Sequence, residues 1–269
     1  MTKDKILNII LGSDSLPTLS TVASKLITII SDEDTSMREI AELISKDISI
    51  STKILKIVNS SFYSFPQKIG TIQQAVTILG RNALRNLVLS FSFLKLNADD
   101  DQGNFDYERY WEQSLAAGVS ARLIMKNVTN KNSDEIFVSG LLQNIGELFL
   151  ARCFPQKYEK VQNTVQEEGL SLIEAEHRVF GTDHSFIGGE VTKAWGFPAV
   201  LTECISYHHN AEGYTGTNKE IIRNINVVYL SGVLSNIFYT AEPQKYLDEF
   251  KLKATELLNL NTEVIDTIL

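Results

Sequence analysis

The chain has 269 residues, of which 43% are hydrophobic, and only 5 prolines, so we expect a folded globular protein rather than a disordered one. Its 25 basic and 33 acidic side chains give a formal net charge of −8. The acidic excess falls within residues 105–269, which hold 14 basic and 22 acidic residues, whereas residues 1–104 hold 11 of each. Since a nucleic-acid-binding face must neutralise phosphates, this balance argues against that class of protein.

The sequence shows no feature of a membrane or secreted protein. No apolar run approaches the roughly 20 residues that cross a bilayer, and the N-terminal segment lacks the small-residue cleavage site of a signal peptide. Cys153 and Cys204 have no metal-binding spacing between them, so we expect both in the core. These features predict a cytoplasmic protein.

Apolar residues recur at three- and four-residue steps through most of the chain, which predicts an all-α, multi-helical fold. The first apolar stripe covers residues 19–30. A second helix is expected after Ser36, which forms a capping box with Glu39 and so satisfies amide groups at the helix start. A third stripe follows at residues 50–58.

The next apolar segment, residues 72–79, predicts a helix that ends at Gly80, since glycine tolerates the positive φ found at many helix C-termini. Residues 84–94 predict another helix, although the apolar run at 87–96 leaves a buried strand as an alternative. Residues 97–104 are polar and acidic, which is typical of a linker, and we place a subdomain boundary there.

The second half of the chain also reads as a succession of helices. Ser171 and Glu174 form another capping box, and Gly181 is the expected stop of that helix. Two or three more helices are predicted after residue 219. The other expected helices cover residues 107–127, 133–149, 155–169, 184–195 and 198–209.

Residues 140–148 read Gly-Leu-Leu-Gln-Asn-Ile-Gly-Glu-Leu and are expected to lie on one helix. This segment resembles the signature of the HD superfamily of metal-dependent phosphohydrolases, whose two central positions are His and Asp. The order of motifs along the chain is similar to that of the HDOD family, bacterial domains that are related to HD enzymes but commonly lack their metal ligands. The resemblance covers about residues 10–240 and rests on Leu16-Pro17, 47–60, 72–80, Trp111, 140–146, 184–189, Trp195 to Pro198 and His208-His209.

The resemblance also implies where an HD enzyme would hold its metals. The early His corresponds to Gln113, the His-Asp pair to Gln143 and Asn144, and the late Asp to Gly232. Amide side chains are neutral and weak ligands for such ions, and glycine offers no ligand. Without a held ion, metal-assisted hydrolysis has no acidified water. We therefore expect vestigial HD-site positions, no catalytic residues, and no bound metal or cofactor.

His184, His208 and His209 are the remaining metal-ligand candidates, since the resemblance to HD-GYP-type relatives implies metal-holding histidines in this region. Neighbouring helical residues diverge by about 100°, so we expect only one of His208 and His209 to face a given pocket. Two histidines make a poor site unless Glu147 or Asp183 joins them. The alternative is that His184 and one of the pair are ordinary packed histidines.

The resemblance implies a non-catalytic regulatory module of bacterial signal transduction, which acts on signalling proteins in trans or binds a small ligand such as a nucleotide. We expect one HDOD domain overall, with an N-terminal helical subdomain at 1–104 and a degenerate HD-like bundle with a C-terminal helical extension at 105–269. A metal-dependent phosphohydrolase that uses the residual histidines stays open as an alternative. A nucleic-acid-associated regulator also stays open, although the predicted helices between residues 36 and 56 carry few basic side chains.

Overall fold

The computed structural model of the chain describes residues 2–12, 29, 34–46, 48–59, 68–94, 105–129 and 134–269. These residues form helices and connecting turns, and no strand occurs among them. The all-α prediction is therefore confirmed. The predicted linker at 97–104 and, apart from Ile29, the predicted helix at 19–30 lie outside the described residues.

The chain separates into two compact units, one formed by residues 17–99 and the other by residues 1–16 and 100–269. The division predicted at residue 104 lies close to the second of these boundaries. The N-terminal helix α1 (Lys3–Leu11), however, belongs to the larger unit, where it packs against α8 (Ile145–Cys153) and α11 (His184–Ala194). It does so because its apolar face, Ile6 and Ile10, is fully buried.

The smaller unit contains α3 (Met37–Ile44) and α4 (Ile48–Val58), both packed against α5 (Ile72–Leu94). The capping box that was predicted for α3 is confirmed, because Ser36 and Glu39 exchange side-chain and backbone hydrogen bonds. Helix α5 is kinked at Gly80, whose φ of 73° only glycine adopts without strain. The predicted break is thus confirmed, and the alternative strand at 87–96 is wrong up to residue 94, where the described part ends.

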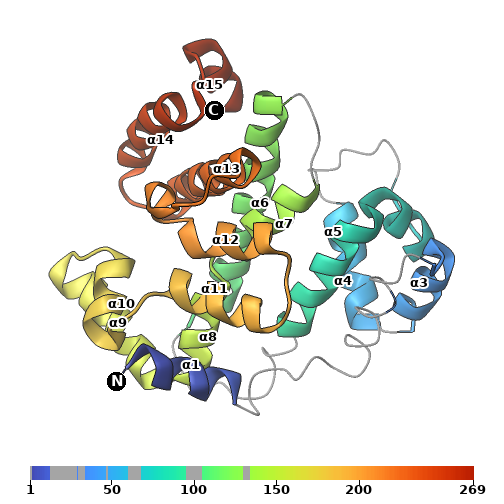
Figure 1. Ribbon diagram of the computed structural model, residues 1–269, viewed down its shortest axis with the longest axis horizontal. Coiled ribbons are helices and arrows are strands. Elements are labelled where there is room, and N and C mark those ends of the chain that lie inside the picture. The colour runs from blue at the N-terminus through green and yellow to red at the C-terminus, as the bar shows by residue number, and fades with distance from the viewer. Residues whose placement is uncertain are drawn as a thin grey trace. The chain divides into compact units, whose positions relative to one another are not determined.

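The larger unit is a stack of helices. In Figure 1, α8, α11, α12 (Ala199–Tyr207), α13 (Lys219–Asn236) and α14 (Pro243–Leu258) follow one another, and each packs against the next. Helix α6 (Tyr107–Thr129) packs against α7 (Asp134–Leu142) and α13. The remaining helices are α9 (Pro155–Glu168), α10 (Leu172–Phe180) and α15 (Thr262–Ile268).

The prediction of one helix over residues 133–149 is wrong, because a turn at Gln143 and Asn144 separates α7 from α8. The break lets α7 pack against α6 while α8 packs against α11. Helices α8 and α11 cross at backbone contact: a Cβ on Gly146 would lie 1.9 Å from the carbonyl oxygen of His184 and 2.6 Å from the amide nitrogen of Gly188. This crossing brings the Gln143–Asn144 turn close to the first residue of α11.

Two helical stretches of the described chain, Glu135–Cys153 and Lys219–Tyr239, reach the length and hydropathy of a membrane span, which the sequence reading did not anticipate. Of the most apolar 18-residue segment in each stretch, 78% is buried inside the protein in the first and 56% in the second. Burial of this extent is typical of core helices. Cytoplasmic localisation stays a prediction.

Candidate functional site

A cavity of about 800 Å³ opens in the larger unit and collects almost all of the residues that the sequence singled out. Helices α6, α8 and α13 contribute to its lining, together with the start of α11 and the turn after α12. The predicted site residues that line it are Gln113, Gln143, Asn144, Glu147, His184, His208, His209 and Gly232. Asp183 is the one predicted site residue that is not part of the lining.

The four positions predicted to be a vestigial HD site line this same cavity. A Cβ on Gly232 would lie 3.0 Å from Oε1 of Gln143, and Gln113 donates a hydrogen bond of 2.5 Å to Asn236, one turn beyond Gly232. Gln143 is 1% exposed, and neither its Oε1 nor its Nε2 has a hydrogen-bond partner in the described part of the chain. None of the four positions offers an imidazole or a carboxylate, so they do not fit the metal set of an HD enzyme. Their descent from such a site stays a prediction.

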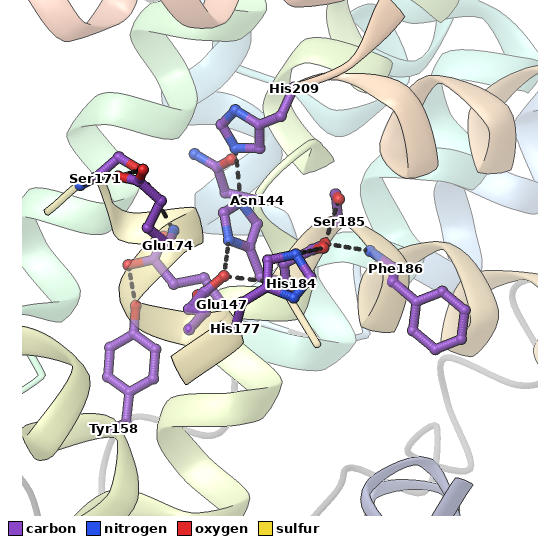
Figure 2. Close-up of polar contacts among 12 residues, drawn as sticks. Asn144, Glu147, Tyr158, Ser171, Glu174, His177, His184, Ser185, Phe186 and His209 are labelled. Atoms are coloured by element: carbon purple, nitrogen blue, oxygen red, sulfur yellow. Dashed lines mark hydrogen bonds and ion pairs between the residues drawn. The ribbon is translucent and has the colours of Figure 1, made fainter. Parts of the chain in front are cut away.

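The three histidines form a cluster in which ring nitrogens face one another. Nε2 of His184 lies 3.0 Å from Nε2 of His209 and 3.3 Å from Nε2 of His208. Figure 2 shows His184, His209 and Asn144 gathered in one place. The expectation that only one of His208 and His209 reaches a given pocket is wrong. The reason is that α12 ends at Tyr207 and both residues lie in the following turn, so regular helical spacing does not separate them.

Glu176 on α10, which the sequence analysis missed, fixes the first of these rings. Its buried Oε2 accepts hydrogen bonds from both Nδ1 and the backbone amide of His184, at 2.7 and 2.9 Å. The sequence pattern that could have identified Glu176 is the four-residue spacing of Leu172, Glu176 and Phe180, which places a carboxylate on the apolar face of a helix. Nδ1 of His208 is likewise engaged, 2.7 Å from the carbonyl oxygen of Ile205.

The neighbouring groups shift the pKa values of the three imidazoles in different directions. Burial by itself lowers the pKa of His184, but the Glu176 carboxylate and its hydrogen bond raise that pKa to about 9. Burial, and then the nearby His209 and His184, lower the pKa of His208. Loss of solvent around the ring and the charge of His184 lower the pKa of His209, although that residue as a whole is exposed. At neutral pH, His208 and His209 therefore present neutral rings with nitrogen lone pairs.

Glu147 and Tyr158 form a second polar pair in the lining of the cavity. The Tyr158 hydroxyl donates a 2.6 Å hydrogen bond to Oε1 of Glu147 (Figure 2). Burial raises the pKa of Glu147, while His184 and the hydrogen bond from Tyr158 act against that rise. Glu190 on α11 does not line the cavity and lies 3.8 Å from Lys193 instead, so it is not placed as an acid/base partner of Glu147.

Asp183 has a structural role at the start of α11. Its Oδ1 accepts a 2.9 Å hydrogen bond from the Phe186 amide and another from the Ser185 hydroxyl, and its Oδ2 lies 2.9 Å from Nε2 of His177. Although burial acts in the opposite direction, these hydrogen bonds lower the pKa of Asp183. Asp183 caps the helix that positions His184 rather than facing the cavity.

The fold is that of a known class of all-helical proteins. A proposed phosphohydrolase from Shewanella amazonensis has a solved structure that matches with a TM-score of 0.74 and 20% identity, over 97% of this chain and 93% of that one. A model of the HDOD domain family matches residues 16–211, and the chain belongs to this family. The predicted resemblance to the HDOD family is confirmed, over residues 16–211 where about 10–240 was expected.

Two further relatives match almost the whole chain. The MmoQ response regulator of Methylococcus capsulatus has a solved structure with a TM-score of 0.52 and 25% identity, over 95% of this chain and 98% of that one. An uncharacterised protein of Treponema pallidum is 23% identical over 261 residues, which is 94% of this chain. The chain spans half the length of that Treponema protein.

Proposed function

We propose that this HDOD protein is a regulatory module of signal transduction that acts by binding rather than by hydrolysis. One observation carries the proposal: Gln143, Asn144 and Gly232 line one cavity and supply two neutral amides and no third side chain where an HD phosphohydrolase has imidazole and carboxylate ligands. Metal-assisted hydrolysis depends on an ion that acidifies a water and polarises the phosphoryl oxygen. Membership of the HDOD family and the likeness to a response regulator support a regulatory role.

The cavity is suited to a small ligand. Its volume of about 800 Å³ lies within the usual range for ligand pockets, and Phe105 and Tyr110 contribute aromatic rings to the lining. A buried amide without partners destabilises the folded state by about 1–3 kcal/mol, and a ligand with a matching donor and acceptor would recover this energy at Gln143. A nucleotide is such a ligand, since its base carries adjacent donors and acceptors. Arg109 and Lys245 of the lining could meet its phosphates.

Regulation also requires a protein partner. We propose that the ligand-bound chain acts on a signalling protein in trans, as the HDOD resemblance implies. Affinity capture with and without ligand tests this step. We expect a specific partner whose recovery changes with ligand, and equal recovery in both conditions would contradict it.

The ligand step is tested by thermal unfolding in the presence of mononucleotides and cyclic dinucleotides. We expect at least one nucleotide to raise the unfolding temperature of the wild type but not of Gln143→Leu, and to be recovered intact by chromatography. Gln156→Leu is the matched control, because Gln156 is exposed and lies outside the cavity. No stabilisation by any nucleotide would contradict nucleotide binding, and recovery of hydrolysed nucleotide would contradict a non-catalytic role.

The histidine cluster favours a second candidate, a metal-dependent phosphohydrolase that uses His184, His208 and His209. This candidate predicts hydrolysis products in the same nucleotide mixtures when a divalent metal is added. It also predicts that His184→Ala and His208→Ala lose those products. Equal product formation by both variants and the wild type would exclude it.

A further inference from the structure

One wall of the cavity is formed by α14, which lies outside residues 16–211, the part of the chain that the HDOD family model matches. Lys245, Tyr246 and Glu249 are the residues that α14 contributes to the lining. Lys245 and Glu249 are four residues apart, so they share one face of the helix. A cation, an aromatic ring and a carboxylate therefore border the cavity from a single element.

The carboxylate of Glu249 is held in place by the neighbouring helix α13. The Tyr229 hydroxyl donates a 2.8 Å hydrogen bond to Oε1 of Glu249. Burial and this bond to Glu249 raise the pKa of Tyr229, so the hydroxyl keeps its proton and remains a donor. In the described part of the chain, Oε2 of Glu249 accepts no hydrogen bond, and its carboxylate forms no ion pair. Since Glu249 is half-buried and lines the cavity, Oε2 is a fixed acceptor that is open to a ligand.

The chemistry of a carboxylate limits what can meet this oxygen. An ionised carboxylate only accepts hydrogen bonds, and it repels a phosphate, so the ligand must present a donor such as a hydroxyl. In dinucleotide-binding folds, an Asp or Glu side chain accepts a hydrogen bond from the ribose 2′-hydroxyl in this way. Lys245 forms no ion pair with a described residue, so it is available to the phosphate of the same ligand.

We propose that Glu249 selects ribonucleotides over 2′-deoxyribonucleotides by accepting a hydrogen bond from the ribose 2′-hydroxyl, and that Tyr229 is its positioning residue. The inference rests on the proposed binding of a nucleotide and adds the sugar that this nucleotide carries. Loss of one hydrogen bond to a charged group weakens binding about 10–100-fold, which sets the size of the expected preference.

The arrangement of α13 allows one nucleotide to reach both ends of the site. Tyr229, Gly232 and Asn236 follow one another at steps of three and four residues, so they lie on the face of α13 that borders the cavity. A Cβ on Gly232 would lie 3.0 Å from Oε1 of Gln143. Gln143 and Glu249 thus approach neighbouring turns of α13, with the base placed at the first residue and the ribose at the second.

The test compares ribose and 2′-deoxyribose forms of the same mononucleotides and cyclic dinucleotides, with affinities taken from the concentration dependence of thermal unfolding. We expect the wild type to bind the ribose form about 10–100-fold more tightly. Glu249→Gln keeps an oxygen for Tyr229 but places an amide donor at the Oε2 position. This variant should lose affinity for the ribose form alone, so that both sugars bind equally. Tyr229→Phe should reduce the preference without changing affinity for the deoxyribose form.

Asp248→Asn is the matched control, because Asp248 is exposed, lies outside the lining and accepts a hydrogen bond from Gln244. Its sugar preference should equal that of the wild type. Equal binding of both sugars by the wild type, or an undiminished preference in Glu249→Gln, would overturn the inference and leave the proposed nucleotide binding intact. An unchanged preference in Tyr229→Phe would overturn the positioning role. Absence of binding by either sugar series would overturn both proposals. Should Glu249→Gln fail to fold, the comparison of sugars on the wild type and on Tyr229→Phe decides.

Discussion

At the scale of single residues, two glutamates and two cysteines have properties that burial sets. Glu176 is fully buried and accepts hydrogen bonds from Nδ1 and the backbone amide of His184. Glu147 accepts a hydrogen bond from the hydroxyl of Tyr158 in the lining of the cavity.

The raised pKa of Glu147 leads to a pH-dependent prediction. Burial raises this pKa above its ordinary value, so the folded chain holds the proton to a higher pH than the unfolded chain. The contribution of Glu147 to stability therefore falls as pH rises from the ordinary value of 4.5 through the raised pKa. Glu147→Gln removes the ionisation and keeps an oxygen for Tyr158. Its stability relative to the wild type should increase across that window, as measured by denaturant unfolding. A pH-independent difference would contradict the assignment.

The two cysteines should differ in reactivity. Cys204 is fully buried, and burial raises the pKa of its thiol to about 12, so almost no thiolate is present near neutral pH. Cys153 is half-buried. Iodoacetamide should therefore modify Cys153 well before Cys204 in the native protein, as followed by peptide mass spectrometry. Similar rates in the native state, or faster modification of Cys204, would show that the core around α12 is more open than described.

The sequence identified His184, His208 and His209 as candidates, because their residue type and position can be read without a structure. It did not identify Glu176, because a glutamate on a helix is usually solvated and only packing shows that this one is buried beside His184. Glu176 and His184 lie eight residues apart on different helices, and no local pattern joins them.

At the scale of elements, helix ends were predictable where a local signal encodes them. The capping boxes at Ser36 and Ser171 and the stop at Gly181 all appear as expected. The turn at Gln143–Asn144 was not predicted, because the apolar spacing continues through it and the contacts that require the break lie on α6 and α11. Gly146 on α8 and Gly188 on α11 have no side chain, and this permits the close crossing of the two helices.

The crossing of α8 and α11 predicts a large effect of Gly146→Ala. The added Cβ would lie 1.9 Å from the His184 carbonyl oxygen, a backbone atom that cannot move without shifting α11. We expect the free energy of unfolding to fall by about 1–3 kcal/mol, even though alanine favours helix formation more than glycine does. Gly70→Ala is the control: its Cβ would meet nothing within 4 Å, and a change within about 0.5 kcal/mol is expected. Equal stability of both variants would contradict the described crossing.

At the scale of the whole molecule, the sequence predicted the class of fold and the family, but it did not predict the unit to which the first helix belongs. The apolar pattern of α1 shows that it buries one face, yet nothing in the pattern shows against which unit. Contacts place it on α8 and α11, within the unit that carries the site. The site likewise emerges only at this scale, because its lining comes from helices between α6 and α14 that are distant in sequence.

We propose that the cavity binds its ligand without hydrolysing it. The most direct test is turnover of bis(para-nitrophenyl) phosphate, a generic phosphodiester, by the wild type supplied in turn with Zn²⁺, Mn²⁺ and Co²⁺. His208→Ala, which removes a ring from the cluster, supplies the background rate. We predict the same rate for both proteins with every ion. A wild-type rate clearly above that of His208→Ala would contradict the account and identify the histidine cluster as a working hydrolytic centre.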